Sequence, residues 1–398
     1  IATMRILLSF EICMNKVKLA LNEIAYAKDS SKLQFAHRSL VPLLSVSSFV
    51  YKVSIWLRSW LYGFGILRSH RLPVPVISVG NLTWGGNGKT PMTEFISRLL
   101  SSSGISPLIL SRGYAGGDEA KMLIRHLSDE NVKIGVGANR VATALRFLKK
   151  YGYESPGDII VGDGSRGQKI GAVVLDDGMQ HWRLQRDLEI VMVNGLTPWG
   201  NCRLLPLGPL RETISALQRA DAVVVHHANL ATGSQLNDIE FTIRKIKQPL
   251  YMFFTEMSAS HLFEVGNSQQ IIPVDALRNA IILCVCGIGC SDSFVQGMNK
   301  VGARFTDKLD FCDHHKFVHR DMELIKRKLE KLEGMFESQP WVIITEKDYD
   351  RGCEIWKHLS PFKTMVLCSK LQFFQGKAQS LDEFISLIRS PWKAKSIE

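Results

Sequence analysis

The segment 83–90, T-W-G-G-N-G-K-T, constrains the fold of this chain more than any other part of the sequence. It follows the apolar run 74–80, which reads as a buried strand, and it precedes a helical stretch that begins near Lys89. The glycines of the segment allow the backbone to curl so that successive N–H groups point at phosphate oxygens, and a helix N-terminus adds partial positive charge. We therefore predict a phosphate-binding loop, although Thr83 stands where the general motif has its first glycine.

Within this loop, Lys89 is expected to reach the β- and γ-phosphates of ATP, and Thr90 is expected to offer its hydroxyl to Mg²⁺. Asp176 and Asp177 follow another apolar run, so they lie at the edge of the sheet where open α/β folds bind ligands, and we expect them to hold the metal. On its own, D-D-G is more often a plain turn. The residues expected to contact the nucleotide are Thr83, Gly85, Gly86, Asn87, Gly88, Lys89 and Thr90.

Short apolar runs alternate with helical stretches from about residue 72 onward. The runs of the first set are 74–80, 107–113, 172–178, 188–194 and 220–226, and those of the second set are 280–287, 341–346 and 364–368, with a helix at 323–332. Strands that alternate with helices predict a parallel sheet covered on both faces, here an α/β fold of the P-loop NTPase type with a second, smaller α/β domain. The expected divisions are a leader at 1–38, an amphipathic helix at 39–71, a P-loop domain at 72–250, a connection at 251–275 and the smaller domain at 276–398.

The stretch 39–67 is the most hydrophobic part of the chain. Lys52 and Arg58 divide it into uncharged pieces shorter than the roughly 18–20 residues of a membrane-spanning helix. At 100° per residue, one face of this helix collects Phe49, Val53, Trp56, Leu57, Trp60, Phe64 and Leu67. Such a face suits a helix that lies in the membrane interface, and it equally suits a helix packed on the protein's own core.

The charge balance of 49 Lys and Arg against 38 Asp and Glu gives a net charge of +11, which favours an anionic partner. Nucleic acid is not expected, because the basic residues are dispersed and no aromatic–basic motif occurs. The eight cysteines include no C-x-x-C pair; Cys284, Cys286 and Cys290 fall in or just after an apolar run, which favours a buried strand over a metal site. We infer no protein partner from the sequence.

A series of motifs in a fixed order resembles the tetraacyldisaccharide 4′-kinase family. The motifs are V-G-N-L-T-W-G-G-N-G-K-T-P, S-R-G-Y, G-D-E, L-D-D-G-M-Q-H-W-R-L-Q-R-D, L-L-P-L-G-P-L-R-E, G-I-G, D-H-H and T-E-K-D. In that family Ser or Thr stands at the position of Thr83. The resemblance, which is to the plant branch, implies transfer of the γ-phosphoryl group of ATP to the 4′-hydroxyl of an acylated glucosamine disaccharide 1-phosphate. A lipid substrate makes the interfacial role of the 39–67 helix the expected one.

The resemblance also implies roles for individual side chains. It makes Asp118 of G-D-E the general base, and it pairs Asp118 with His314 of D-H-H, which orients the carboxylate. In S-R-G-Y-A-G-G-D-E only Ala115 and Gly116 separate the two motifs, fewer residues than the family has, which affects the placement of Asp118. The implied substrate contacts are Gln180, His181 and Arg211, and Glu212 is a further metal or substrate ligand. Arg112 and Arg140 are additional candidate phosphate contacts.

Several alternatives remain open at this point. Asp118 is otherwise a solvated loop acid, Arg211 and Glu212 a plain ion pair, and His314, His315 and His319 candidate metal ligands that lack companion motifs. A P-loop switch ATPase at a membrane is the alternative function, although a switch has no need of a base for a sugar hydroxyl. A plant-type relative suggests the mitochondrion, but residues 1–38 mix basic with acidic side chains and make a mediocre targeting segment.

Overall fold

The computed structural model describes residues 17–27, 33–113, 117–154, 169–377 and 380–395. Much of the predicted leader (1–16 and 28–32) and the S-R-G-Y tyrosine with the two residues after it (114–116) lie outside these ranges. The helices are α2 (Phe35–Gly63), α3 (Lys89–Ser102), α4 (Asp118–His126), α5 (Arg140–Tyr151), α6 (Gly233–Arg244), α7 (Ser291–Lys300), α8 (His319–Phe336), α9 (Glu346–Arg351) and α10 (Leu381–Lys395). Residues 17–26 are also helical, and η3 (Ile214–Arg219), η4 (Val274–Leu277) and η5 (Cys353–Leu359) are 3₁₀ turns.

The described strands join into one sheet in the order β10-β9-β11-β12-β7-β6-β5-β1-β4-β2-β3, with β8 paired to β7. Their bounds are β1 (Val76–Asn81), β2 (Pro107–Ser111), β3 (Lys133–Val136), β4 (Ala172–Asp176), β5 (Leu188–Asn194), β6 (Ala222–His226), β7 (Tyr251–Glu264), β8 (Asn267–Ile272), β9 (Ile281–Cys286), β10 (Phe305–Asp310), β11 (Trp341–Thr345) and β12 (Thr364–Phe373). The predicted apolar runs correspond to β1, β2, β4, β5, β6, β9, β11 and β12, and the P-loop NTPase type of fold is confirmed.

The part of the sheet from β6 to β3 is parallel and covered on both faces, which explains why its central strands are buried at every position and largely apolar. Helices α3 and α10 pack on one face, against Ile77 and Val79 of β1. Helices α5 and α6 pack on the opposite face. Strand β1 pairs with β4 on one side and β5 on the other, so the loop after β1 lies at the centre of the carboxyl edge.

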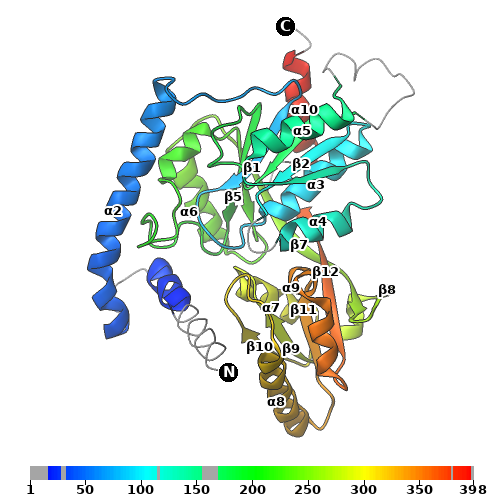
Figure 1. Ribbon diagram of the computed structural model, residues 1–398. Coiled ribbons are helices and arrows are strands. Elements are labelled where there is room, and N and C mark those ends of the chain that lie inside the picture. Colours follow the sequence, from blue (N-terminus) through cyan, green and yellow to red (C-terminus); the bar gives the residue numbers. More distant parts are fainter. Residues whose placement is uncertain (1–16, 28–32, 114–116, 155–168, 378–379, 396–398) are drawn as a thin grey trace, which may run out of the picture.

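The segment 251–275, predicted as a connection, contains the two strands β7 and β8, which pair antiparallel. The first five residues of the 14-residue strand β7 pair in parallel with β6, and the following residues pair antiparallel with β12. Strands β7 and β12 therefore run between the upper half of the molecule in Figure 1, which carries β1, and the lower half, which carries β9 to β11.

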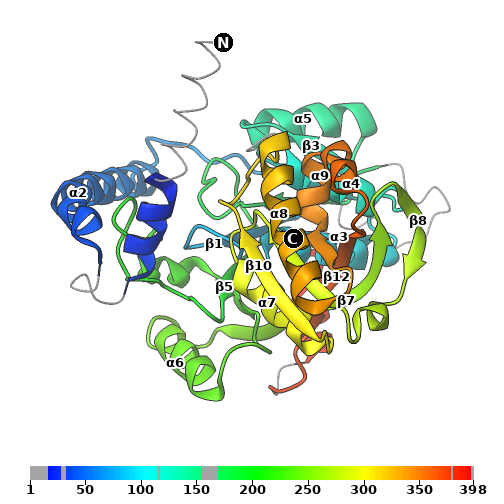
Figure 2. The ribbon, with the colours of Figure 1, turned by 90° about the horizontal axis from the view of Figure 1, so that it is seen from below.

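Helix α2 stands along one side of the molecule (Figures 1 and 2). All seven residues of its predicted apolar face are exposed, by 40% to 68%, so that face does not pack on the protein's own core. The opposite side of α2 packs against the rest of the protein. Ser48 Oγ donates to Leu204 O at 2.9 Å, and Tyr51 and Ile55 pack on the hydrophobic core that includes residues of β5 and β6. By length and composition alone, His37–Gly63 is long and apolar enough to cross a membrane.

Candidate active site

The glycine-rich loop joins the end of β1 to the start of α3, as the sequence predicts. Gly85 and Gly88 have φ values of 93° and 76°, in the region that favours glycine, and a Cβ at Gly88 would lie 2.5 Å from the ring of His226. Thr83 has a defined role at its unusual position, because Asn87 Nδ2 donates to Thr83 Oγ1 at 2.9 Å and to its carbonyl oxygen at 3.2 Å. The threonine therefore ties the two ends of the loop together.

The two predicted metal-binding aspartates have different surroundings. Asp176 is buried, and its two carboxylate oxygens lie 3.4 Å from Thr90 Oγ1 and from Thr93 Oγ1. Burial, and then the negative charges of Glu119 and Asp177, raise the pKa of Asp176. This excess of negative charge beside the Thr90 hydroxyl is what a bound cation would compensate.

Asp177 already faces cations. Arg211 Nη1 donates to both of its carboxylate oxygens, at 2.7 and 2.8 Å, and Lys89 Nζ lies 3.7 Å from Oδ1. Although desolvation in the cleft opposes ionisation, Lys89 and Arg211 hold the pKa of Asp177 well below its usual range. Asp177 therefore links Lys89 of the glycine-rich loop to Arg211 of the R-E motif. Its φ of 55° places it at the tight turn after β4.

Gln180 contacts both Arg211 and Glu212, since its Oε1 accepts from Arg211 Nη1 at 3.4 Å. Gln180 Nε2 donates to Asn81 O at 3.0 Å and to Glu212 Oε1 at 3.3 Å, and Arg219 Nη2 donates to Glu212 Oε2 at 2.7 Å. Gln180 is thus fixed between β1 and the R-E loop. Glu212 is buried, and it makes an ion pair with Arg219 rather than with its neighbour Arg211.

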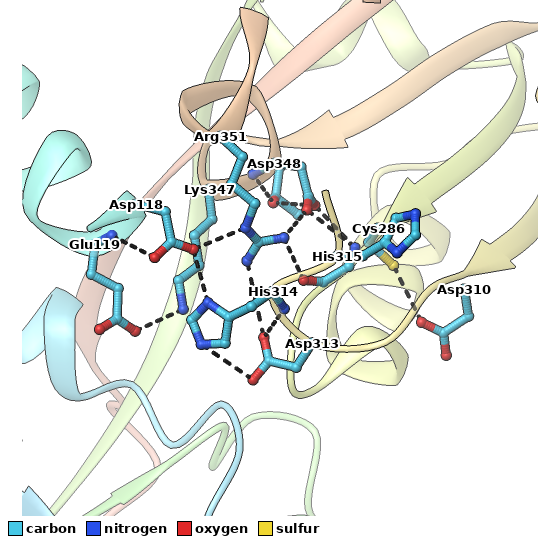
Figure 3. Close-up of polar contacts among 12 residues, drawn as sticks. Asp118, Glu119, Cys286, Asp310, Asp313, His314, His315, Lys347, Asp348 and Arg351 are labelled. Carbon is cyan, nitrogen blue, oxygen red and sulfur yellow. Dashed lines mark hydrogen bonds and ion pairs between the residues drawn. The ribbon is translucent and has the colours of Figure 1, made fainter. Parts of the chain in front are cut away.

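Asp118 and His314 meet across the cleft, at 3.0 Å between Asp118 Oδ2 and His314 Nδ1, although 196 residues separate them in the sequence. Figure 3 shows that Arg351 approaches the same oxygen; its Nε lies 2.8 Å away. Asp118 is 2% exposed and begins α4, whereas the side chain of His314 is 20% exposed and lines the cavity. Burial opposes ionisation of Asp118, but His314, Lys347 and Arg351 hold its pKa well below the usual range.

Helix α9, which carries T-E-K-D, supplies the cations that surround G-D-E (Figure 3). Lys347 Nζ contacts Glu119 Oε1 at 2.8 Å, so the two acids of G-D-E contact separate cations, Asp118 with Arg351 and Glu119 with Lys347. Asp348 is fully buried; it accepts from the Gly287 N–H of G-I-G at 3.2 Å and from Arg351 Nη1 at 2.6 Å. Sequence reasoning did not find Arg351, and T-E-K-D was the only signal toward Lys347.

All five predicted substrate contacts line the same cavity as Lys89 and His314, namely Arg112, Arg140, Gln180, His181 and Arg211. Arg140 is buried, its Nη2 donates to Asp177 O at 3.5 Å, and within the described structure its Nε and the Nε2 of His181 have no hydrogen-bond partner. Burial, followed by the charges of four arginines (140, 186, 183 and 58), lowers the pKa of His181 to about 4. This corner of the cavity is strongly positive and suits an anionic group.

The structure does not support a metal site at the histidines of 314–319 or at the cysteines of 284–290. Among the described residues no group of three or more His, Cys, Asp and Glu side chains has the arrangement of a metal site. Cys284 and Cys286 are buried in β9, as the strand interpretation predicts. His315 is hydrogen-bonded to Asp321 at 2.8 Å, and His319 contacts the ring of His358.

One cavity of about 1970 Å³ joins these parts. It lies between the two halves of the molecule and is lined by the glycine-rich loop, by Asp176 and Asp177, by Arg211, by His314 and by Lys347. The phosphate-binding loop, on the upper half, and the Asp118–His314 pair, which bridges to the lower half, therefore face one space. That arrangement suits transfer of a phosphoryl group to a hydroxyl whose proton the pair accepts.

Comparisons with known proteins agree on one family. Residues 40–387 match the model of the tetraacyldisaccharide-1-P 4′-kinases. An Arabidopsis thaliana protein named "Probable tetraacyldisaccharide 4′-kinase, mitochondrial" is 50% identical over 379 residues, covering 93% of this chain and 96% of the relative. A tetraacyldisaccharide 4′-kinase of Syntrophus aciditrophicus is 32% identical over 77% of this chain and 83% of the relative. In fold, the chain resembles LpxK from Aquifex aeolicus, crystallised with ATP, with a TM-score of 0.60 at 24% identity over 89% of this chain and 98% of that one.

Proposed function

This chain belongs to the tetraacyldisaccharide-1-P 4′-kinase family, and from that premise we propose how its cavity performs the reaction. The γ-phosphoryl group of ATP is transferred to the 4′-hydroxyl of a tetraacylated glucosamine disaccharide 1-phosphate, in lipid A biosynthesis. The observation that carries this assignment is the placement of the Asp118–His314 pair and the Lys89 loop around one cavity.

The glycine-rich loop holds the phosphates of ATP. The backbone N–H groups of the turn and the N-terminus of α3 attract the β- and γ-phosphates, and Lys89 provides the positive charge at the transferred group. Asp177 keeps Lys89 and Arg211 on the same side of the cavity, since it contacts both. Arg211 is thereby positioned to offset the charge that develops on the phosphoryl oxygens.

Thr90 and Asp176 are suited to Mg²⁺, because both present oxygen ligands and the Asp176 carboxylate lies in an excess of negative charge. Mg²⁺ commonly uses one or two protein oxygens together with substrate phosphates, and in that position it neutralises phosphate charge. Asp177 and Glu212 have arginine partners, so we assign to them the orientation of Arg211 and Gln180.

Asp118 and His314 act together as the acceptor of the hydroxyl proton. The contacts of Asp118 keep its carboxylate ionised, so it stabilises a protonated imidazole on His314 when the pair takes the hydroxyl proton. His314 is the member of the pair that lines the cavity, so it orients the pair toward the sugar. Arg351 fixes the carboxylate from behind and, through Asp348, ties it to Gly287 of G-I-G.

The lipid reaches the site from the membrane surface beside α2. The side of α2 opposite its exposed apolar face contacts the loops of the P-loop half. Ser48 donates to Leu204 O, Tyr51 donates to Arg211 O, and Arg58 donates to Gln180 O. A membrane-spanning α2 would bring these irregular loops into hydrocarbon, so we infer that the helix lies along the interface. Arg112 and Arg140 provide positive charge for phosphate on the lipid, and the neutral ring of His181 lines the cavity beside them. Following the plant relative, we place the enzyme at a mitochondrial membrane.

The test is direct. Purified full-length protein is incubated with γ-labelled ATP, Mg²⁺ and a tetraacyl disaccharide 1-phosphate in detergent micelles, and labelled lipid is measured beside released phosphate. We expect lipid phosphorylation that needs Mg²⁺ and falls at least about 10³-fold in Lys89→Ala, because that lysine contacts the transferred group. Phosphate release without labelled lipid would instead favour the switch ATPase, and full transfer by Lys89→Ala would refute the phosphate role of the loop.

A further inference from the structure

Residues 17–26 form a helix that precedes residue 40, where the match to the family model begins. The helix lies between α2 and the lower half of the molecule in Figure 1, and it is built into the protein. Ile24 and Ala25 are buried, and Asn201 donates from its backbone N to Ala25 O at 2.9 Å and from its side chain to Ile24 O at 3.0 Å. A Cβ at Gly200 would lie 2.7 Å from Ala25 O, so the helix fits tightly on this loop.

One end of the helix touches the phosphate-binding loop. Tyr26 Oη donates to the carbonyl oxygen of Trp84 at 3.5 Å and lies beside Gly85. The G-I-G turn packs against the same part of the glycine-rich loop, because a Cβ at Gly289 would lie only 2.4 Å from Gly86 N. Burial, and then the neighbouring Cys290, raise the pKa of Tyr26 to about 12, so its hydroxyl remains a donor at neutral pH.

The other end of the helix reaches toward the loop that carries His314. Burial raises the pKa of the Cys312 thiol and the nearby positive charge of Lys18 opposes this rise, and Lys18, Cys312 and His314 line the same cavity. Lys18, Leu19, Leu21, Asn22 and Tyr26 all line the 1970 Å³ cavity. The helix therefore extends along the cavity from the phosphate-binding loop to the D-H-H loop.

We propose that helix 17–26 is a wall of the active site and that Tyr26 is a positioning residue, which holds the Trp84–Gly85 turn in the shape that receives the phosphates of ATP. The inference rests on the proposed function in one respect, namely that this loop binds ATP. It assigns residues 17–26, which the sequence pattern places in a leader, to the folded enzyme, so that the catalytic unit begins before the region that the family model matches.

The test compares Tyr26→Phe and Tyr26→Ala in the otherwise complete chain, with Val17→Ala as the matched control on an exposed position of the same helix. We measure the Kd of a fluorescent ATP analogue, the KM values for ATP and lipid, kcat, and the melting temperature. Tyr26→Ala should weaken nucleotide affinity about tenfold or more, and Tyr26→Phe about two- to fivefold, the value of one neutral hydrogen bond. Changes in kcat and in the KM for lipid should stay within about threefold, and Val17→Ala should match the wild type.

Tyr26→Phe keeps the ring and its packing, so a melting temperature equal to that of the wild type removes misfolding as an explanation. Unchanged nucleotide affinity in both Tyr26 variants would overturn the inference, as would a loss confined to kcat. Since affinity is measured directly, a wild type that binds the analogue without phosphorylating the lipid would refute the proposed function alone. The effect of Tyr26 on binding would then still decide this inference.

Discussion

Replacement of Asp118 by asparagine tests the proton-accepting pair with a minimal change of shape. The carboxylate accepts at both of its oxygens: Glu119 N donates to Oδ1 at 3.0 Å, while His314 Nδ1 and Arg351 Nε lie 3.0 and 2.8 Å from Oδ2. An amide accepts at one position only and carries no charge, so Asp118→Asn loses at least one of these hydrogen bonds and the ability to take a proton. Arg351 keeps Asp348 as its ionic partner at 2.6 Å.

The size of the effect follows from these contacts. Loss of a general base lowers kcat by about 10²- to 10⁴-fold, which corresponds to about 3–5 kcal/mol of transition-state stabilisation. Exchange of charge-assisted hydrogen bonds for neutral ones costs stability of about 1–3 kcal/mol, little enough for the protein to remain folded. Nucleotide affinity should change by less than about twofold, because the atoms that hold ATP lie on the loop at 83–90.

The assay is labelled-lipid formation at saturating ATP, beside the Kd of an ATP analogue and the melting temperature. Asp275→Asn serves as the matched control, since Asp275 also lines the cavity but is largely exposed and pairs with Arg278. We expect its kcat to stay within about twofold of the wild type. Turnover by Asp118→Asn within tenfold of the wild type would refute the reasoning, and so would an equal loss in Asp275→Asn.

Two further predictions concern other parts of the molecule. Burial opposes protonation of His126, but hydrogen bonds with Glu346 and Glu94 raise its pKa to about 9, so it contributes stability of up to about 3 kcal/mol that is fully present below pH 6.5 and lost as the pH rises through 9. The gap in melting temperature between wild type and His126→Gln should therefore be wide at pH 6 and nearly closed at pH 9.5; a gap that is independent of pH contradicts this. On α2, Phe49→Ser with Trp56→Ser should weaken binding to lipid vesicles at least about 10²-fold, because each exposed side chain is worth about 1.5–3 kcal/mol when buried. Ile271→Ser, on β8 at the opposite side of the molecule in Figure 1, should leave sedimentation with vesicles unchanged, and equal binding by all variants would exclude the anchor.

Sequence patterns predicted the buried part of the sheet well and its less buried part poorly. Strands β5 and β9 are buried at every position because helices cover both faces, and their largely apolar sequences make that burial visible in the chain. The middle of β7, E-M-S-A-S, borders the cavity and includes polar, partly exposed residues, so it gave no strand signal. Strand β10 was missed for a similar reason, since its residues are only partly buried at the edge of the sheet.

For the candidate site, too, the sequence predicted some residues and missed others. Local motifs predicted the glycine-rich loop and the acids after β4, because strand, turn and helix follow one another in the sequence. The pairing of Asp118 with His314 came from resemblance, and Arg351 was not found at all. Its contact with Asp118 spans 233 residues, and an isolated arginine two residues after a T-E-K-D-Y sequence has no recognisable spacing. Charge networks between distant segments become visible only once the sheet has brought them together.

The passage of β7 and β12 between the two halves determines how the cleft can move. From Thr255 to Glu264, β7 forms with β12 an antiparallel ribbon whose register shifts between Cys368 and Ser369. Because this ribbon is hydrogen-bonded along its length, a widening of the cleft would have to twist or bend it. We therefore expect the ribbon to return the two halves to one relative position, which a disordered linker would not do. The length of the ribbon therefore sets the distance between the glycine-rich loop on one half and His314 on the other. Lengthening the ribbon by two residues would move these two parts of the site apart without changing any residue of the site.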